Sequence, residues 1–267
     1  MSKAIALGIA GVTVSFAMLA AGFVAGSRND LSAAPYGAGS GSPVLERAVS
    51  RGDVEAIVRA YLVENPEILT EMQAVLAQRE EEQQRLALLE AIGSSSDTIF
   101  NAAYDGVVGN PDGSTTVVEF FDYNCGYCKR AYEDMAAMVA EDADLRFVLK
   151  EFPILGPDSQ RAHIVSMAFR ALAPEKYGEF HRTLLTGGRA TEAAAIATAV
   201  GLGVDEAALR EEMKNPAIAD AFNETYELAS RLAITGTPSY VVGKEVVFGA
   251  LGKAVLKEKV ELARAGD

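Results

Sequence analysis

Residues 115–130 read TTVVEFFDYNCGYCKR, and this stretch decides the fold. It opens with a run of β-branched and aromatic residues that predicts a strand, and residues 128–140 predict a helix directly after it. Apolar side chains occupy both faces of the strand, interrupted only by Glu119, which is typical of a central strand covered by helices on both sides. The two cysteines of the chain therefore lie where a buried strand gives way to a helix.

Cys125 and Cys128 are the only cysteines in the chain. A disulfide framework needs several cysteines, and a structural zinc site usually needs four ligands. The only two histidines, His163 and His181, lie far along the chain in helical patterns, so we interpret both as ordinary structural residues. A close cysteine pair at the start of a helix instead indicates a redox-active dithiol, with no metal and no cofactor.

The position of Cys125 at a helix start predicts a low thiol pKa, because free backbone N–H groups and the helix dipole stabilise a thiolate there. Cys128 follows on the same helical turn and is the candidate resolving cysteine, more buried and less reactive. Gly126 and Tyr127 separate the two sulfur atoms and are expected to tune the redox properties of the pair. Two basic side chains add positive charge on the next turn: Lys129 and Arg130.

Glu119 is the second candidate site residue. A buried carboxylate is costly unless it is partnered or protonated, so we expect a raised pKa. Six residues before Cys125, this side chain can lie beneath the dithiol and exchange the proton that the chemistry requires. Lys150 and Glu151, in the neighbouring predicted strand, are its candidate partners. The alternative is that Glu119 points to a solvated sheet edge.

Thr237 and Pro238 form the third candidate element, directly before a predicted strand at residues 239–242. A proline at this place removes a backbone donor from the sheet. A cis Thr237–Pro238 bond would expose the backbone of Thr237 to an incoming extended peptide, which makes both residues candidate substrate-binding positions. A plain trans turn is the alternative.

The composition divides the chain into an export segment, a linker, a helical extension and a mixed α/β domain. Residues 4–26 carry no charge, so residues 1–30 are either an uncleaved membrane anchor or a removed signal peptide, with a buried core helix as the third interpretation. The remaining expected parts are a flexible linker at residues 31–50, a helical extension at 51–95, and a domain at 96–267 with a helical insertion at about 158–234.

The fold class predicted from this order of elements is α/β. The layout is β-α-β, then a helical block, then ββα, which is that of a thioredoxin-like fold with an inserted helical domain and an N-terminal helical extension. Within the extension, residues 78–85 contain no apolar side chain, so it can serve as an oligomerisation or spacer helix or as a solvated linker helix.

The chain has 24 basic and 37 acidic residues and a formal net charge of −13. An acidic chain without a Lys/Arg-rich stripe has no general attraction for nucleic acid, so we expect no nucleic-acid partner.

Residues 120–130 together with Gly236-Thr237-Pro238 resemble the DsbA-type thioredoxin-fold thiol:disulfide oxidoreductases, in particular the ScsC and Com1-like branch. Residues 61–67 (YLVENPE) are typical of the N-terminal extension of that branch. The resemblance implies that Cys125 is the nucleophile, Cys128 the resolving cysteine and Glu119 the buried acid. It also implies a cis-proline loop at Thr237-Pro238.

The resemblance further implies a periplasmic enzyme that forms or isomerises disulfides in exported, cysteine-containing proteins and exchanges electrons with a membrane redox partner. Tethering to the inner membrane would follow if residues 4–26 remain attached. Some similar proteins form oligomers through N-terminal helices, so the resemblance keeps two alternatives open for residues 51–95: a homo-oligomer and a helical extension without partners. The alternative function is a non-enzymatic copper-handling or scaffold protein that binds Cu(I) through the two thiolates. The absence of a Met-rich or His-rich tract near the cysteines argues against it.

Overall fold

A computed structural model describes residues 49–266 of the 267-residue chain. By their internal contacts, the described residues divide into two units, with the boundary between Glu64 and Asn65. The expected anchor or signal at residues 4–26 and nearly all of the expected linker lie outside the described residues. Between residues 49 and 266, no helix is both long enough and apolar enough to cross a bilayer.

The first unit contains helix α1 (Arg51–Glu64). Ser50 and Asp53 form a reciprocal capping box, because the Ser50 backbone N–H donates to the Asp53 carboxylate and the Asp53 N–H donates to the Ser50 hydroxyl. No α1 residue is buried. Its large apolar side chains recur at helical spacing and are exposed: Val54, Ile57, Val58, Tyr61, Leu62 and Val63.

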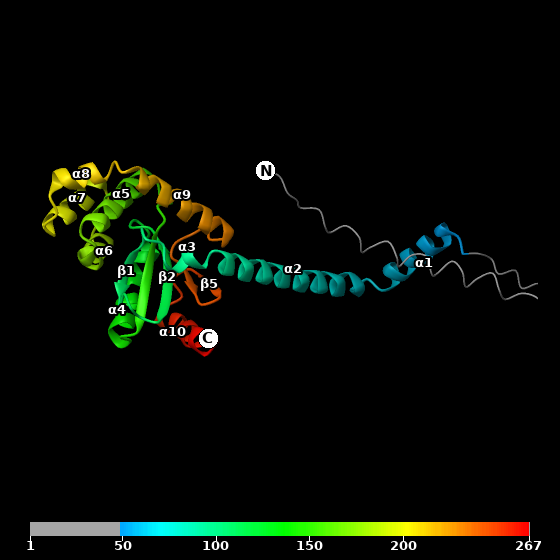
Figure 1. The fold of residues 1–267 in the computed structure, drawn as a ribbon. Helices are drawn as coiled ribbons and strands as arrows, with labels where there is room; N and C mark the ends of the chain where they lie inside the picture. Colours follow the sequence, from blue (N-terminus) through cyan, green and yellow to red (C-terminus); the bar gives the residue numbers. More distant parts are fainter. Residues whose placement is uncertain (1–48, 267) are drawn as a thin grey trace, which may run out of the picture. The chain divides into compact units, whose positions relative to one another are not determined.

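The second unit is built around a five-stranded sheet in the order β1-β3-β2-β4-β5 (Figure 1). Its strands are β1 (Gly106–Gly109), β2 (Thr115–Phe121), β3 (Leu145–Glu151), β4 (Ser239–Val242) and β5 (Glu245–Phe248). Strands β2 and β3 are parallel, and the other neighbours are antiparallel. Its helices are α2 (Glu67–Ser94), α3 (Ser96–Phe100), α4 (Gly126–Glu141), α5 (Pro157–Leu172), η1 (Pro174–Lys176), α6 (Tyr177–Thr186), α7 (Glu192–Gly201), α8 (Glu206–Glu212), α9 (Pro216–Arg231) and α10 (Lys253–Ala265).

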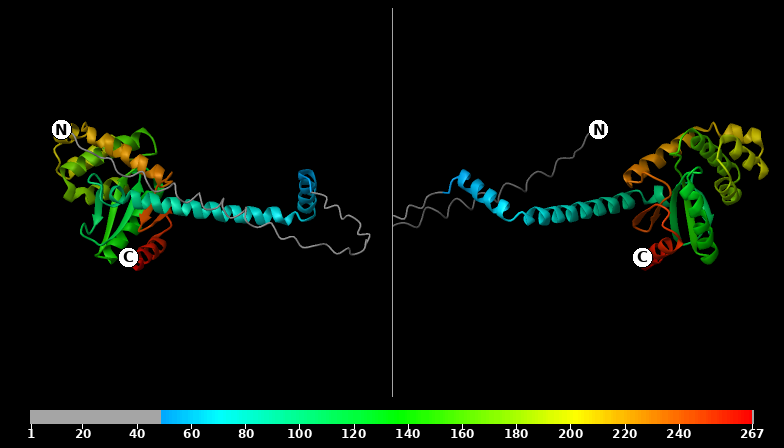
Figure 2. Two further views of the ribbon diagram at one scale, coloured as in Figure 1. Left: turned by 45° about the vertical axis from the view of Figure 1, so that its right-hand side comes forward. Right: turned by 180° about the vertical axis from the view of Figure 1, so that it is seen from behind.

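Strand β2 is central, and its side chains enter two separate apolar clusters. Val117 and Phe121 lie in one cluster, with apolar side chains of α4, α5, α6 and α10. Val118 and Phe120 point the other way, into a cluster with α3, α9 and the last turns of α2. The sheet is therefore covered on both faces, as the views in Figures 1 and 2 show. The predicted thioredoxin-like α/β fold is confirmed.

Five α-helices, α5 to α9, lie between β3 and β4 and form the insertion. Helix α5 begins with Pro157, whose fixed backbone suits the first helical turn, and it follows Gly156 at a φ of 99°. Side chains of α5, α6 and α7 join the same cluster as Phe121, so the insertion packs against the C-terminal end of β2.

Helix α2 has two different parts. Its last turns pack onto the domain, where Ile92 is buried and Leu88 and Ala91 are partly buried. The polar run at 78–85 continues the helix because Gln, Glu and Arg are good helix formers, and Glu82 and Arg85 pair across one turn at 2.8 Å. Before that run, several large apolar side chains are exposed: Leu69, Met72, Val75 and Leu76.

Candidate active site

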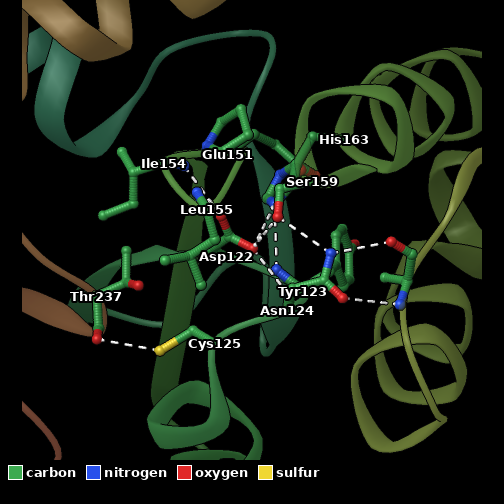
Figure 3. Close-up of polar contacts among 12 residues, drawn as sticks. Asp122, Tyr123, Asn124, Cys125, Glu151, Ile154, Leu155, Ser159, His163 and Thr237 are labelled. Atoms are coloured by element: carbon green, nitrogen blue, oxygen red, sulfur yellow. Dashed lines mark hydrogen bonds and ion pairs between the residues drawn. The ribbon is translucent and has the colours of Figure 1, made fainter. Parts of the chain in front are cut away.

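Cys125 follows β2 after a three-residue segment and is the N-cap residue of α4. Its extended backbone (φ −75°, ψ 115°) turns the chain from strand into helix, and its N–H donates to the Asp122 carbonyl at 3.0 Å. Both cysteines are free; Cys125 is 6% exposed and Cys128 is fully buried. The Cys125 sulfur also lies 3.2 Å from the Thr237 carbonyl oxygen, so the two segments meet at this atom (Figure 3).

Their surroundings shift the pKa values of the two thiols in opposite directions. The pKa of Cys125 falls to about 5, chiefly because the Cys128 thiol donates to its sulfur, with further donors in the Thr237 side chain and the N–H groups of Cys128 and Tyr127. Burial raises the pKa of Cys128, and the nearby Cys125 and Glu119 raise it further. At neutral pH this arrangement holds a thiolate at Cys125 and a thiol at Cys128.

The two basic side chains expected to support the thiolate are engaged elsewhere. The Lys129 ammonium donates to the carbonyls of Gly187 and Gly188, at 3.1 and 2.5 Å. The Arg130 guanidinium lies over the Tyr127 ring, 4.3 Å from its centroid. Tyr127 itself is 61% exposed at the rim of the site. The donors that hold the thiolate are therefore neutral groups of the helix start and the Thr237 loop.

Glu119 is buried, with 3% of its surface exposed, so the alternative of a solvated sheet edge is wrong. Burial raises its pKa to about 8, and the Cys125 charge adds to the effect. The Tyr240 hydroxyl, on the adjacent strand β4, donates to its carboxylate at 3.5 Å. Glu119 is therefore a carboxyl group held largely protonated near neutral pH, and it interacts electrostatically with both cysteines.

Lys150 and Glu151 do not partner Glu119, so that expectation is wrong. Glu119 is in register with Leu149 on β3, and Lys150 is in register with Phe120, whose side chain lies on the other face. The Lys150 ammonium there pairs with Asp105. Glu151 lies two residues further along β3 and contacts His163 instead.

The Thr237–Pro238 peptide bond is cis, so the alternative of a plain trans turn is wrong. Pro238 is buried and Thr237 is partly exposed, and the next residue begins strand β4. The Pro238 carbonyl accepts the Gly249 N–H at 2.9 Å, which ties this loop to the end of β5. The loop thereby presents the Thr237 backbone beside the Cys125 sulfur.

The sequence of the chain matches a known family over residues 116–261, that of the DSBA-like thioredoxin domain. The chain belongs to this family. Residues 51–83 also match the copper resistance protein ScsC N-terminal domain. The protein is thus a DsbA-like thiol–disulfide oxidoreductase with an ScsC-like N-terminal part, as the sequence predicted.

Three relatives illustrate the family. A thioredoxin-like oxidoreductase from Silicibacter pomeroyi is 38% identical with a TM-score of 0.60, covering 63% of this chain and 97% of its own. A linker-deletion mutant of Proteus mirabilis ScsC is 25% identical with a TM-score of 0.63, covering 85% of this chain and 100% of its own. Disulfide bond formation protein D of Bacillus subtilis is 25% identical over 167 residues, 58% of this chain and 75% of that protein.

Sequence reasoning missed a buried polar network behind the DsbA-like dithiol. His163 and His181 were interpreted as ordinary histidines, and both are buried. His163 contacts Glu151 and the Tyr123 backbone, whereas neither nitrogen of His181 has a hydrogen-bond partner among the described residues. A signal was present in the sequence, because polar residues recur along one face of α5 at helical spacing: Ser159, His163 and Ser166.

No group of three or more His, Cys, Asp or Glu side chains in residues 49–266 is arranged to hold a metal ion.

Proposed function

We propose that this protein forms or isomerises disulfide bonds in exported proteins through the Cys125-Gly126-Tyr127-Cys128 dithiol. The observation that carries the proposal is the position of the Cys125 sulfur at the start of α4, next to the buried Cys128 and 3.2 Å from the Thr237 carbonyl oxygen. These surroundings lower the pKa of Cys125 to about 5. The thiolate is the attacking species in disulfide exchange, and a thiol with a low pKa is also a good leaving group. Both properties favour exchange through the Cys125 sulfur.

In the oxidising direction, a substrate thiolate attacks the Cys125 sulfur of a Cys125–Cys128 disulfide. A mixed disulfide forms, and the Cys128 sulfur leaves with the electron pair and takes a proton. Glu119, which is largely protonated near neutral pH, supplies that proton. A second substrate thiolate then attacks the substrate sulfur of the mixed disulfide and releases the Cys125 thiolate. Two electrons pass from the substrate to the dithiol.

In the isomerising direction, the reduced Cys125 thiolate attacks a substrate disulfide and one substrate sulfur leaves as a thiolate. Another substrate thiolate then attacks the mixed disulfide, so a new pairing forms without net oxidation. Thr237 and Pro238 bind the substrate backbone beside the Cys125 sulfur in either direction. Gly126 and Tyr127 tune the redox balance of the pair, with the Tyr127 ring exposed toward the substrate.

The proposal includes a site of action and partners. Residues 1–30 export the chain to the periplasm as a signal or an inner-membrane anchor, and a membrane redox partner reoxidises or reduces the dithiol. A solved structure with a similar fold, at 22% identity, is that of a periplasmic thioredoxin-like protein from Salmonella enterica serovar Typhimurium. Copies of the chain associate through residues 51–95, where α1 and α2 expose their apolar side chains.

The direct test is the replacement Cys125→Ser, assayed for reduction of insulin and for refolding of a substrate with scrambled disulfides. The variant should lose both activities. Cys128→Ser is the matched control, because it keeps the attacking thiol and should accumulate mixed disulfides. Turnover retained by Cys125→Ser would rule out this mechanism.

Copper handling is the second candidate, favoured by the match of residues 51–83 to a domain described as part of a copper resistance protein. The two thiolates would bind Cu(I), a soft cation that prefers sulfur ligands. Competition with a coloured Cu(I) chelator tests this function. A wild-type protein that takes no Cu(I) from the chelator, or a Cys125→Ser, Cys128→Ser double variant that takes as much as wild type, would eliminate it.

A further inference from the structure

The three residues between β2 and Cys125 leave the hydrogen-bond ladder of the sheet. The Phe121 carbonyl accepts the Phe152 N–H, and after this bond the backbone N–H groups find partners outside the sheet. The Asn124 N–H donates to the Asp122 carboxylate at 2.8 Å, and the Tyr123 N–H donates to the imidazole of His163 at 3.1 Å. The segment that presents Cys125 is therefore held by side chains.

Asp122 anchors the first end of this segment. One carboxylate oxygen accepts the N–H groups of Ile154 and Leu155, at 2.9 and 3.0 Å. The other accepts the Ser159 hydroxyl at 2.8 Å, so the end of β2 is bound to the loop before α5 and to α5 itself. The Asn124 side chain exchanges two hydrogen bonds with the backbone of Ala190. The hydrogen bonds of Asp122 and of Asn124 thus hold the two ends of the segment against residues of the helical insertion and the loop before it (Figure 3).

His163 holds the middle of the segment. Because the Tyr123 N–H is a donor, the Nε2 atom that faces it accepts, and the proton of the neutral ring is on Nδ1. Nδ1 faces the Glu151 carboxylate, which accepts this proton as a hydrogen bond and orients the ring. Glu151 also accepts the hydroxyls of Ser166 and Tyr177, at 2.6 and 2.9 Å. Every side chain in this chain of contacts is buried.

We propose that His163 is a positioning residue for Cys125: its imidazole, oriented by Glu151, accepts the Tyr123 N–H and so fixes the segment that presents the Cys125 sulfur. The inference rests on the proposed function, in which Cys125 is the attacking thiol. The donors that stabilise the thiolate belong to Cys128, Tyr127 and Thr237, so they act only while Cys125 keeps its place at the helix start. Loosening the segment weakens these contacts and disfavours the reduced form of the dithiol.

The test compares two buried histidines in the full-length protein. His163→Phe removes the acceptor for the Tyr123 N–H, and His163→Gln supplies an amide oxygen that can replace it. His181→Phe is the matched control: the His181 ring also packs against Phe121 and Tyr123, at centroid distances of 4.7 and 5.5 Å, yet it binds no backbone group of the segment. The measurement is the redox equilibrium of the dithiol with glutathione at mildly alkaline pH. Burial lowers the pKa of His163, but the Glu151 and Asp122 carboxylates raise it above its ordinary value, so an alkaline pH favours the neutral imidazole.

His163→Phe should shift this equilibrium about tenfold toward the disulfide form, or about 30 mV for a two-electron couple. His163→Gln should restore most of the wild-type equilibrium, and His181→Phe should have the same equilibrium as wild type. Equal equilibria for His163→Phe and wild type would overturn the inference, and so would equal shifts in both phenylalanine variants. If the wild-type dithiol does not exchange with glutathione at all, the proposed function fails instead.

A second measurement needs no variant, in case His163→Phe does not fold. Nitrogen NMR of the imidazoles in the reduced wild-type protein should show His163 protonated on Nδ1 and unprotonated on Nε2, with a coupling across the hydrogen bond from the Tyr123 amide. A proton on Nε2 at mildly alkaline pH would contradict the proposed role of the ring.

Discussion

Glu119 is buried, accepts a hydrogen bond from the Tyr240 hydroxyl and interacts electrostatically with Cys125. Desolvation disfavours its charged form and raises its pKa in the folded state to about 8, well above the ordinary value of 4.5 for a glutamate. A carboxyl group with this pKa can donate a proton at neutral pH and regain it between turnovers. The residue therefore suits protonation of the Cys128 sulfur as it leaves the disulfide.

Replacing Glu119 by Gln should slow disulfide exchange by about 100-fold or more, because the amide keeps the shape but cannot transfer the proton. In wild type, the contribution of this acid should decline as pH rises through about 8, and the variant should lack that decline. Stopped-flow measurement of the dithiol reaction between neutral and alkaline pH checks both effects. Identical pH–rate profiles for the two proteins would remove Glu119 from the mechanism.

The thiolate environment could be predicted from the sequence only in part. A cysteine at a strand-to-helix junction implies backbone donors, and the low pKa of Cys125 agrees with that expectation. The contribution of Lys129 and Arg130 could not be judged, because their partners at Gly187, Gly188 and Tyr127 depend on side-chain directions in three dimensions. The same limit applies to Glu119, whose partner follows from the register of β2 with β4.

At the scale of elements, helix α2 packs against the domain core at its C-terminal end and exposes apolar side chains near its N-terminal end. Its last turns supply Ile92 to a core cluster of the domain, whereas Leu69 and Met72 near its start are 64% and 60% exposed. Exposed apolar side chains at helical spacing favour association with another helix. Because Leu88, Ala91 and Ile92 pack against the domain, a truncation meant to keep the domain intact should leave them in place.

The double replacement Leu69→Glu and Met72→Glu should convert an oligomer into monomers, because two charges on the apolar face oppose helix packing. Solution mass by light scattering is the measurement, with isomerase and oxidase assays on the same samples. Gln83→Glu with Gln84→Glu is the matched control, since it adds the same charge in the polar run and should leave the mass unchanged. A wild-type protein that is already monomeric would refute association through this segment.

The order of strands and helices was predictable because each element has a clear pattern. The apolar run of β2, the helix after Cys125 and the strands after Pro238 all occur where the sequence indicates them. The network of Asp122, His163 and Glu151 was not predictable to the same degree. It joins residues from β3, α5 and the segment after β2, and single-sequence patterns do not show which buried polar groups from different elements meet.

At the scale of the whole molecule, a buried histidine couples folding to pH. Burial lowers the pKa of His181 to about 3, below the ordinary histidine value of 6.5, so the folded state favours the neutral ring. The stabilising contribution of this neutral burial is complete above pH 6.5 and is lost as pH falls toward 3. The burial of Glu119 makes folding stability depend on pH in the opposite direction. Its contribution to stability is fully present below pH 4.5 and is lost as pH rises through about 8.

His181→Phe should reduce the acid sensitivity of folding by up to about 1.4 kcal/mol per pH unit below pH 6.5, because the phenyl ring never has to be charged. Urea unfolding midpoints measured at several acidic pH values give the slopes for wild type and variant. Parallel slopes would show that His181 does not carry this acid sensitivity.

The central claim is that Cys125 attacks and Cys128 resolves. The most direct measurement is to mix reduced Cys128→Ser protein with a substrate that has a single disulfide, quench with acid, and map the adduct by non-reducing mass spectrometry. The account predicts a mixed disulfide between Cys125 and one substrate cysteine in most of the protein, and none in Cys125→Ser. An adduct that forms as readily in Cys125→Ser, through Cys128, or no adduct in either variant, would contradict it.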